Sequence, residues 1–247
     1  MRVHRIFIAF TAAALLLGTA VAQEPPGAGG GRGAGRGAGR GAGAAPGGGG
    51  FARPTRPALF FKEEWKETPG GAEKQVDPTQ AVASGNLELK LYGPGGKDIQ
   101  ITGAANNESN PVHLWTGLCE QLCAAALRDK DNYVDLSGLA MIRWVTKVSG
   151  FHLVHPIVKL ADGTWLVGDH GDGSTLDWHT DEFSLGDVRW RKLNIAKVVT
   201  TGDWVANPDL SKVDEVGFTD LLPGSGHGPG GWSDVGRIEV YGKPVKR

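Results

Sequence analysis

The stretch KVDEVGFTDLLPGSGHGPGGWSDVGRIEVYG, residues Lys212–Gly242, decides the fold of this 247-residue chain. Val216 and Phe218 alternate with polar or small residues before a glycine-rich segment, and Ile238 and Val240 do the same after it. Alternation with a period of two indicates β-strands that bury one face. We expect a closing, hairpin-like pair of strands, joined by a loop that is too rich in glycine to hold regular structure.

The same kind of pattern continues toward the N-terminus. Turn signals recur every 8 to 15 residues, and no long amphipathic helix is evident, which predicts an all-β, two-sheet antiparallel sandwich with jelly-roll connections. Residues 114–122 are ambiguous, because leucines spaced by four also fit a short helix. We expect strands at 59–65, 86–92, 112–115, 124–127, 139–148, 151–160, 164–167, 187–195 and 198–205.

The N-terminal 56 residues predict export followed by a linker. Residues 1–22 have a positive start, an apolar run and the small-residue site Ala-Val-Ala, as in a signal peptide. An uncleaved N-terminal anchor is the alternative. Residues 23–56, rich in Gly, Ala, Arg and Pro, include GRGAGRGAGRGAG and have too few large apolar side chains to order themselves. We therefore expect a β-sandwich domain at 57–247, in the periplasm or outside the cell, with no membrane span after cleavage.

Charge and missing motifs exclude several functions. Residues 57–247 hold 19 Lys and Arg against 26 Asp and Glu, an acidic balance that argues against nucleic acid as the partner. The chain has no P-loop, HExxH, GxSxG or EF-hand motif. The glycines at 224–228 resemble a dinucleotide loop only superficially, because a strand follows them instead of a helix.

The only two cysteines, Cys119 and Cys123, are four residues apart. In an exported protein, such a pair most simply forms a local disulfide that pinches a turn. A metal site that adds His113 is the alternative, although it has no obvious fourth ligand.

Four short segments resemble galactose-binding-like jelly rolls, a superfamily that includes many carbohydrate-binding modules. They are DLSGLAMIRWVTK (135–147), VRWRKLNI (188–195), PDLSKVDEVGF (208–218) and DVGRIEVYG (234–242). The resemblance implies the jelly-roll fold and, more weakly, carbohydrate binding, because the superfamily hosts many functions. It also implies a structural calcium ion held by acids of the first and last strands. The matching positions are Glu63 or Glu64 and Asp234, and solvated acids at strand ends are the alternative.

Aromatic and polar residues around 165–179 predict a ligand patch. Sugars offer apolar C–H faces to aromatic rings and hydroxyl groups to Asp, His and Arg. The tryptophans also fit a core role. The patch consists of Trp165, Asp169, His170, Asp172, Trp178 and His179.

Further candidates lie elsewhere along the chain. Arg143, grouped with Lys147, His152 and His155, would line a groove if its strand face is concave. His227 and Trp232 in the glycine-rich loop are also candidates for ligand contact.

The sequence thus predicts a noncatalytic domain that binds a glycan or polysaccharide through aromatic and polar loop residues. The alternative is a glycoside hydrolase or lyase that uses Asp and His residues of 169–182, since glycosidases need two opposed carboxylates. A structural surface protein without either activity is a third option. The oligomeric state is left open by the sequence.

Overall fold

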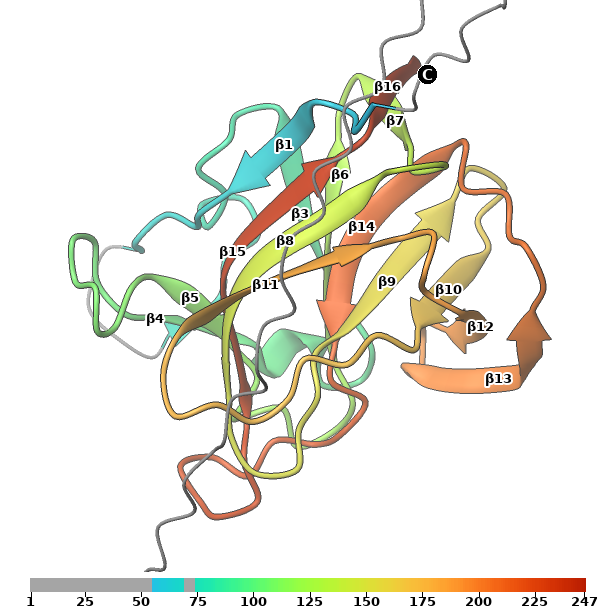
Figure 1. Ribbon diagram of the computed structural model, residues 1–247. Coiled ribbons are helices and arrows are strands. Elements are labelled where there is room, and N and C mark those ends of the chain that lie inside the picture. Colours follow the sequence, from blue (N-terminus) through green and yellow to red (C-terminus); the bar gives the residue numbers. More distant parts are fainter. Residues whose placement is uncertain (1–54, 69–73) are drawn as a thin grey trace, which may run out of the picture. The chain divides into compact units, whose positions relative to one another are not determined.

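The computed structural model describes residues 55–68 and 74–247, which form two antiparallel β-sheets packed face to face (Figure 1). The predicted signal peptide and residues 23–54 of the linker lie outside the described residues. The first sheet, called sheet A, runs in the order β11-β8-β15-β5-β4-β2, with β1 also paired to β15. Its strands are β1 (Leu59–Glu63), β2 (Lys74–Gln75), β4 (Gln100–Thr102), β5 (His113–Trp115), β8 (Met141–Val148), β11 (His179–Ser184) and β15 (Ser233–Tyr241).

The second sheet, sheet B, runs in the order β13-β12-β10-β9-β14-β6-β3. In addition, β7 pairs with β14, and β16 pairs with β7. The predicted all-β, two-sheet antiparallel sandwich is therefore confirmed. Its strands are β3 (Leu87–Tyr92), β6 (Ala124–Asp129), β7 (Asn132–Asp135), β9 (His155–Leu160), β10 (Trp165–Gly168), β12 (Trp190–Asn194), β13 (Val199–Val205), β14 (Val213–Thr219) and β16 (Lys243–Lys246).

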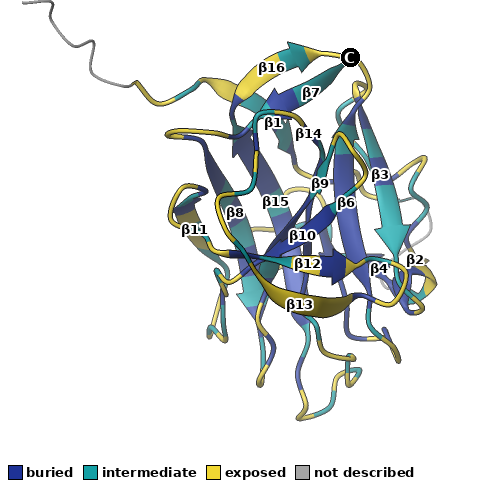
Figure 2. Ribbon diagram, turned by 90° about the vertical axis from the view of Figure 1, so that its right-hand side faces the viewer, coloured by how far each residue is buried: buried dark blue, intermediate teal, exposed yellow. Residues whose placement is uncertain are grey.

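The core lies between the two sheets, where the buried faces of the central strands meet (Figure 2). Sheet A contributes Trp144 and Ile238, and sheet B contributes Leu127, Val158 and Val216. These residues alternate along their strands with side chains that point outward, as the period of two requires. Each sheet consequently has an outer face with side chains that are free to form a binding site.

The segment Lys212–Gly242 does not form a hairpin. β14 belongs to sheet B and β15 to sheet A, so the glycine-rich segment crosses from one sheet to the other. The prediction of a hairpin-like pair was wrong because alternation shows that a face is buried, but not which strand lies beside it. A connection of thirteen residues, 220–232, readily spans the distance of about 10 Å between packed sheets.

The ambiguous region 114–122 contains no helix. β5 ends at Trp115, and the chain then turns through a loop closed by a disulfide between Cys119 and Cys123, whose Cα atoms are 6.3 Å apart. Sequence analysis also missed β11, whose sequence HTDEFS has few apolar residues because β11 is an edge strand. Among the described residues, the only helical segment is a 3-10 turn at Gly96–Asp98, and no helix there is long and apolar enough to cross a membrane.

Gly217 in β14 lies between β6 and β9, where a side chain has no room. A Cβ atom there would come within 2.0 Å of the Ala125 carbonyl oxygen and 2.5 Å of the Ala126 Cα atom. We expect Gly217→Ala to lower the free energy of unfolding by about 1–3 kcal/mol, the usual cost of overpacking. Chemical denaturation measures it, with Gly85→Ala as the control, since a Cβ at Gly85 meets nothing within 4 Å. Equal stability of the two variants would contradict the prediction.

Candidate functional site

A pocket with a cavity volume of about 210 Å³ opens on the outer face of sheet A. Its walls come from strands β4, β5, β8 and β15 and from the three loops that precede β5, β11 and β15. Aromatic rings dominate the lining, together with one lysine and one carboxylate. The lining residues are Thr102, Asn110, His113, Trp115, Lys147, Trp178, His227, Trp232 and Asp234.

Strand register explains why these side chains share one face. Asp234 of β15 lies opposite both Trp115 of β5 and Lys147 of β8. The next position, Val235, lies opposite Leu114 and faces the core. Because successive side chains of a strand point to opposite faces, Asp234, Trp115 and Lys147 must point outward together.

Ring contacts connect the walls of the pocket. The His113 and Trp178 rings meet edge to face, with centroids 4.9 Å apart. The Trp115 ring stacks on His227 at 4.8 Å, and His227 meets Trp232 edge to face at 6.4 Å. These geometries are the ones that aromatic quadrupoles favour. Trp178 and Trp232 stay partly exposed, and His227 is exposed, so their rings are accessible from solvent.

Two glycines make room for the tryptophans. A Cβ atom at Gly236 would lie 3.2 Å from the Trp178 ring, and the strand carries an irregularity in its pairing at this point. A Cβ atom at Gly117 would lie 2.2 Å from the Trp115 ring. The absence of side chains at these two positions lets the tryptophan rings lie close to the backbone.

The glycine-rich loop is held against the disulfide loop. The Gly224 N–H donates to the Cys119 carbonyl at 2.8 Å, and the Gly226 N–H donates to the Gly117 carbonyl at 2.7 Å. A Cβ at Gly224 would lie 2.3 Å from the Gly117 carbonyl oxygen, so only glycine permits this approach. The disulfide and the glycines together place His227 on Trp115.

A buried polar network lies next to the pocket and ties its strands together. Asp220 accepts hydrogen bonds from the Thr116 hydroxyl at 3.0 Å and contacts His152 Nδ1 at 2.9 Å. The Ser233 N–H in turn donates to the Thr116 hydroxyl at 3.0 Å. All four residues are buried, so this network fixes the ends of β5 and β15 that carry Trp115 and Asp234.

The electrostatics of the pocket centre on Asp234. Burial raises the pKa of this carboxyl group to about 7, against the lowering effects of a hydrogen bond from Trp232 and of the Lys147 charge. Its Oδ1 atom has no hydrogen-bond partner among the described residues and lies 3.6 Å from His113 Nε2. Burial also lowers the pKa of His113 to about 4, so this imidazole is neutral near pH 7.

The structure brings together some of the predicted site residues. Trp178, His227 and Trp232 line the pocket. Asp234 lines it as well, although the sequence suggested it as a metal ligand. Lys147, grouped with Arg143 by the sequence analysis, also reaches it.

The remaining members of the predicted 165–179 patch lie elsewhere. Trp165 is buried on the outer side of sheet B, with its ring 4.8 Å from Tyr92. Asp169 is paired with Arg189 at 2.7 Å. His170 contacts Asp181 at 2.6 Å.

Asp172 and His179 contact each other at 2.8 Å, and Asp172 also accepts a hydrogen bond from Thr146 of β8. The His170 ring stacks on Phe183 of the edge strand β11, with ring centroids 3.8 Å apart. Trp178 lines the pocket while His179 contacts Asp172, so these neighbours point to opposite sides, as the sequence predicts for an extended segment.

Arg143 lies on the outer face of sheet A, outside the pocket. Its guanidinium group donates to Glu182 at 3.0 Å and pairs with Glu239 at 3.4 Å. His152 and His155, grouped with Arg143, instead contact Asp220 and the His170 carbonyl group.

The three acids suggested for calcium do not form one cage of oxygen ligands. Glu63 accepts hydrogen bonds from the Ala83 and Ser84 N–H groups, at 2.7 and 3.1 Å. Glu64 pairs with Lys62, and Asp234 lies in the pocket. Within residues 55–68 and 74–247 there is no group of three His, Cys, Asp or Glu side chains arranged to hold a metal ion. Calcium stays a prediction without a ligand set.

The sequence suggested His113 only for a metal site, and it did not single out Trp115, Thr102 or Asn110 for a ligand site. His113 and Trp115 are two apart on β5, which places them on one face, and this alternation was the available signal. The partners that complete the pocket come from β8, β15 and two loops, and only the sheet order shows that they are neighbours.

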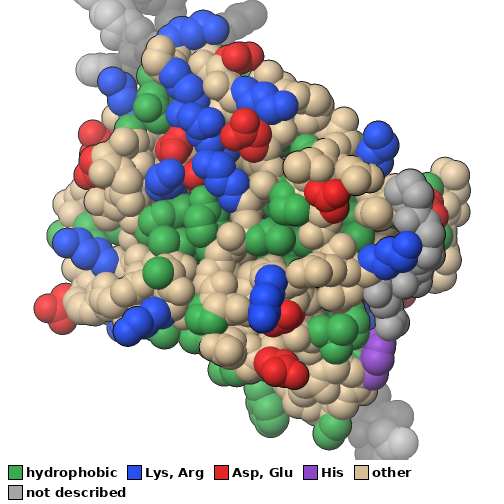
Figure 3. All heavy atoms as spheres, turned by 180° about the vertical axis from the view of Figure 1, so that it is seen from behind, with side chains coloured by type: hydrophobic (Ala, Val, Ile, Leu, Met, Phe, Trp, Pro, Cys, Tyr) green, Lys and Arg blue, Asp and Glu red, His purple; other side chains and the backbone are tan. Residues whose placement is uncertain are grey.

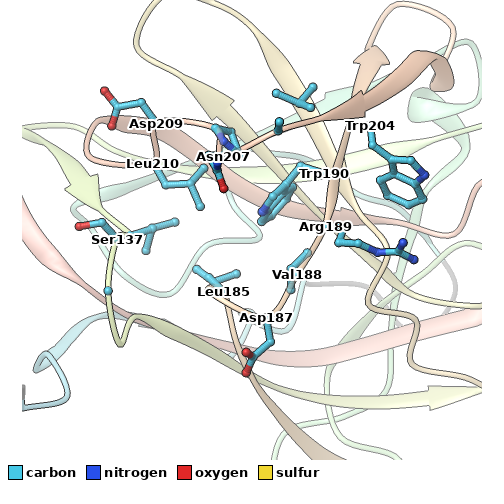
Figure 4. Close-up of a pocket in the computed structure, with 16 residues that line it drawn as sticks. Ser137, Leu185, Asp187, Val188, Arg189, Trp190, Trp204, Asn207, Asp209 and Leu210 are labelled. Atoms are coloured by element: carbon cyan, nitrogen blue, oxygen red, sulfur yellow. The ribbon is translucent and has the colours of Figure 1, made fainter.

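A larger hollow of about 560 Å³ lies between the loops at 136–138, 185–190 and 204–210 (Figure 4). Its inner wall consists of core side chains, among them Trp190, Leu185 and Leu210, which point toward one another. Two of its charged side chains are engaged within the protein: Arg189 pairs with Asp169, and Asp209 accepts from the Ser211 N–H. The hollow is therefore a weaker candidate than the aromatic pocket.

Comparisons with known proteins found solved structures that are similar at low TM-scores. No protein-family model and no curated protein matches it. The family 11 carbohydrate-binding module of the cellulase Lic26A-Cel5E of Clostridium thermocellum is similar, with a TM-score of 0.38 and 16% identity over 72% of this chain and 98% of that one. The carbohydrate recognition domain of Emp47p has a TM-score of 0.34 and 10% identity over 69% and 94% of the chains.

The same Clostridium thermocellum module, in complex with a β-1,3-1,4-mixed-linked tetrasaccharide, has a TM-score of 0.38 and 17% identity over 72% of this chain and 99% of that one. Solved carbohydrate-binding modules are thus among the similar structures, at TM-scores too low to support a family or a function. The function is therefore inferred from the pocket itself.

Proposed function

We propose that this protein is a noncatalytic carbohydrate-binding domain that holds a sugar ring in the pocket on the outer face of sheet A. The observation that carries this proposal is the grouping of Trp115, Trp178 and Trp232 around the carboxyl group of Asp234. Such a site offers flat apolar surfaces and a polar group within one small cavity. That combination matches the two kinds of surface that a sugar presents.

The size of the pocket favours a single sugar ring. Its volume of about 210 Å³ is below the range of about 300–1,000 Å³ that is usual for sites enclosing a drug-sized ligand. A ring that stacks on Trp178 or Trp232 would direct hydroxyl groups toward Asp234, Lys147 and Asn110. The remainder of a longer glycan would extend into solvent over the exposed loop at His227.

The proposed compartment is outside the cytoplasm. The signal-like residues 1–22 and the disulfide between Cys119 and Cys123 both support it, because disulfides persist in oxidising compartments.

Trp178→Ala is the direct test. We expect it to weaken binding of a sugar found on a glycan array at least tenfold, which corresponds to about 1.4 kcal/mol, because the stacking surface is lost. Isothermal titration calorimetry measures the affinity. Trp204→Ala is the matched control, since Trp204 is an exposed tryptophan outside this pocket. Unchanged affinity of folded Trp178→Ala, or no binding of any sugar, would overturn the proposal.

One observation favours catalysis as the second candidate function. A carboxyl group whose pKa is about 7 is suited to general acid catalysis near neutral pH. Asp234 is, however, the only carboxylate among the described residues that line the pocket, whereas glycosidases normally use two. Product analysis after incubation with a bound glycan decides the matter: intact glycan supports binding alone, and cleaved glycan supports an enzyme.

A further inference from the structure

We propose that the pocket prefers an anionic sugar, one whose carboxylate or sulfate group pairs with Lys147. This inference rests on the proposed function and specifies the class of sugar.

Lys147 is the basic residue that lines the pocket together with Asp234. It lies half-buried in the pocket, and no described residue forms an ion pair with it. Its basic neighbours on the outer face of sheet A are all engaged: Arg143 with Glu182, and Arg237 with Glu64 and Glu239. A half-buried ammonium group without a partner gains more from an incoming anion than a solvated one does.

Asp234 does not neutralise Lys147 in this arrangement. The two residues lie directly opposite each other on β15 and β8, where Cβ atoms are about 4.5–5.5 Å apart, yet no ion pair joins them. The Asp234 carboxyl group lies instead near His113 and Trp232. Because burial raises its pKa to about 7, much of this group is protonated at mildly acidic pH.

The pocket then carries a net positive charge from Lys147. The groups that face Asp234 are His113 from β5, Lys147 from β8, and Trp232 with His227 from the glycine-rich loop. His113 is neutral near pH 7, so it does not compensate. A protonated Asp234 donates a hydrogen bond to a sugar oxygen, while Lys147, directly opposite, pairs with the anionic substituent of the same ring.

The pH dependence of affinity separates this inference from binding of neutral sugars. Ionised Asp234 repels a sugar carboxylate, so affinity for an anionic sugar should fall as the pH rises from 6 to 8. A neutral sugar donates hydroxyl groups more strongly to the ionised carboxylate, so its affinity should stay level or rise over the same range. A fall in affinity with rising pH therefore indicates an anionic sugar, and a level or rising affinity indicates a neutral one.

The experiment is calorimetry at pH 6 with methyl galacturonate and methyl glucuronate, their neutral parent glycosides and a 6-sulfated galactoside. We expect the anionic sugars to bind at least tenfold more tightly than their neutral parents. Comparison of the affinities for the carboxylated and the sulfated sugars then identifies which anionic group is preferred. In Lys147→Met the ratio of the two affinities should approach one, while Lys246→Met, an exposed lysine on β16, should keep the ratio of the parent protein.

Equal affinity for anionic and neutral sugars, or an unchanged ratio in Lys147→Met, overturns the anionic preference and leaves carbohydrate binding standing. No binding of any sugar, neutral or anionic, overturns both.

Discussion

Glu215→Ala is expected to lower the free energy of unfolding by about 3–5 kcal/mol, the usual effect of removing one partner from a buried ion pair. The Glu215 side chain is fully buried on the outer side of sheet B, under Lys90 and Lys159, whose ammonium groups both donate to Oε1 at 2.9 Å. Tyr92 donates its hydroxyl group to the other oxygen. Without Glu215, the two lysines face each other across an empty site and Tyr92 loses its acceptor.

Glu215 belongs to a wider charge cluster on this face. Arg128, Lys159 and Arg247 all pair with the neighbouring Asp214. Burial raises the pKa of Asp214, but the hydrogen bonds from these partners outweigh burial and lower this pKa to about 2. Seen from behind, Lys and Arg side chains form a row interspersed with acids above a group of hydrophobic side chains (Figure 3). Without the buried acids, the positive charges of these Lys and Arg side chains would repel one another.

Chemical denaturation at constant ionic strength measures the effect of Glu215→Ala. The matched control is Glu88→Ala on the same sheet, because Glu88 is partly exposed and, among the described residues, forms an ion pair with Arg128 alone, at 3.3 Å. A surface pair of this kind contributes about 0–1 kcal/mol. If Glu215→Ala unfolds within 1 kcal/mol of the parent protein, the buried cluster does not stabilise sheet B in the way that its geometry indicates.

The sequence predicted the class of fold because burial of one strand face requires apolar residues at every second position, a pattern visible within a single segment. Ile142 and Trp144, two apart in β8, were expected to face the core and do so. The period of two records which face of a strand is buried, but the order of strands is set by contacts between distant segments. β14 and β15 show the limit: both were recognised as strands, and their assignment to one hairpin was wrong.

The candidate site could be predicted only in part for the same reason. Trp178, His227 and Trp232 were selected because aromatic rings and imidazoles beside short polar residues in glycine-rich loops suit sugar binding. Trp165 met the same criterion and is buried against Tyr92. The sequence suggested His113 for a metal site and Lys147 for a groove with Arg143, and the two meet in one pocket because β5, β15 and β8 are adjacent in sheet A.

Asp234→Asn is expected to stabilise the protein at pH 8, by up to about 4 kcal/mol. Burial raises the pKa of Asp234 to about 7 in the folded protein, whereas an unfolded chain has its ordinary value of 3.8. Each unit of difference corresponds to about 1.4 kcal/mol between the two protonation states. Asparagine has nearly the same shape, is neutral at every pH, and therefore avoids the cost of placing a charge at the floor of the pocket.

The sign of the pH dependence distinguishes this effect from a simple change in packing. Below pH 3.8 both states are protonated, and the group has no effect on stability. Between pH 4 and 7 the folded state binds more protons than the unfolded state, so the stability of the parent protein falls relative to Asp234→Asn as the pH rises. Above pH 7 the difference is constant.

Thermal or chemical unfolding at pH 4 and pH 8 measures this difference directly. A gap between the two proteins that is the same at both pH values would show that Asp234 keeps an ordinary pKa. Asp169→Asn is the matched control, since Asp169 is an exposed acid paired with Arg189 and its pKa is lowered, so this substitution should destabilise at pH 8. A carboxyl group that destabilises its own fold at neutral pH, with one oxygen left without a hydrogen-bond partner among the described residues, is placed as a ligand-binding group would be. In Asp234→Asn, the affinity for an anionic sugar should consequently lose its dependence on pH between 6 and 8.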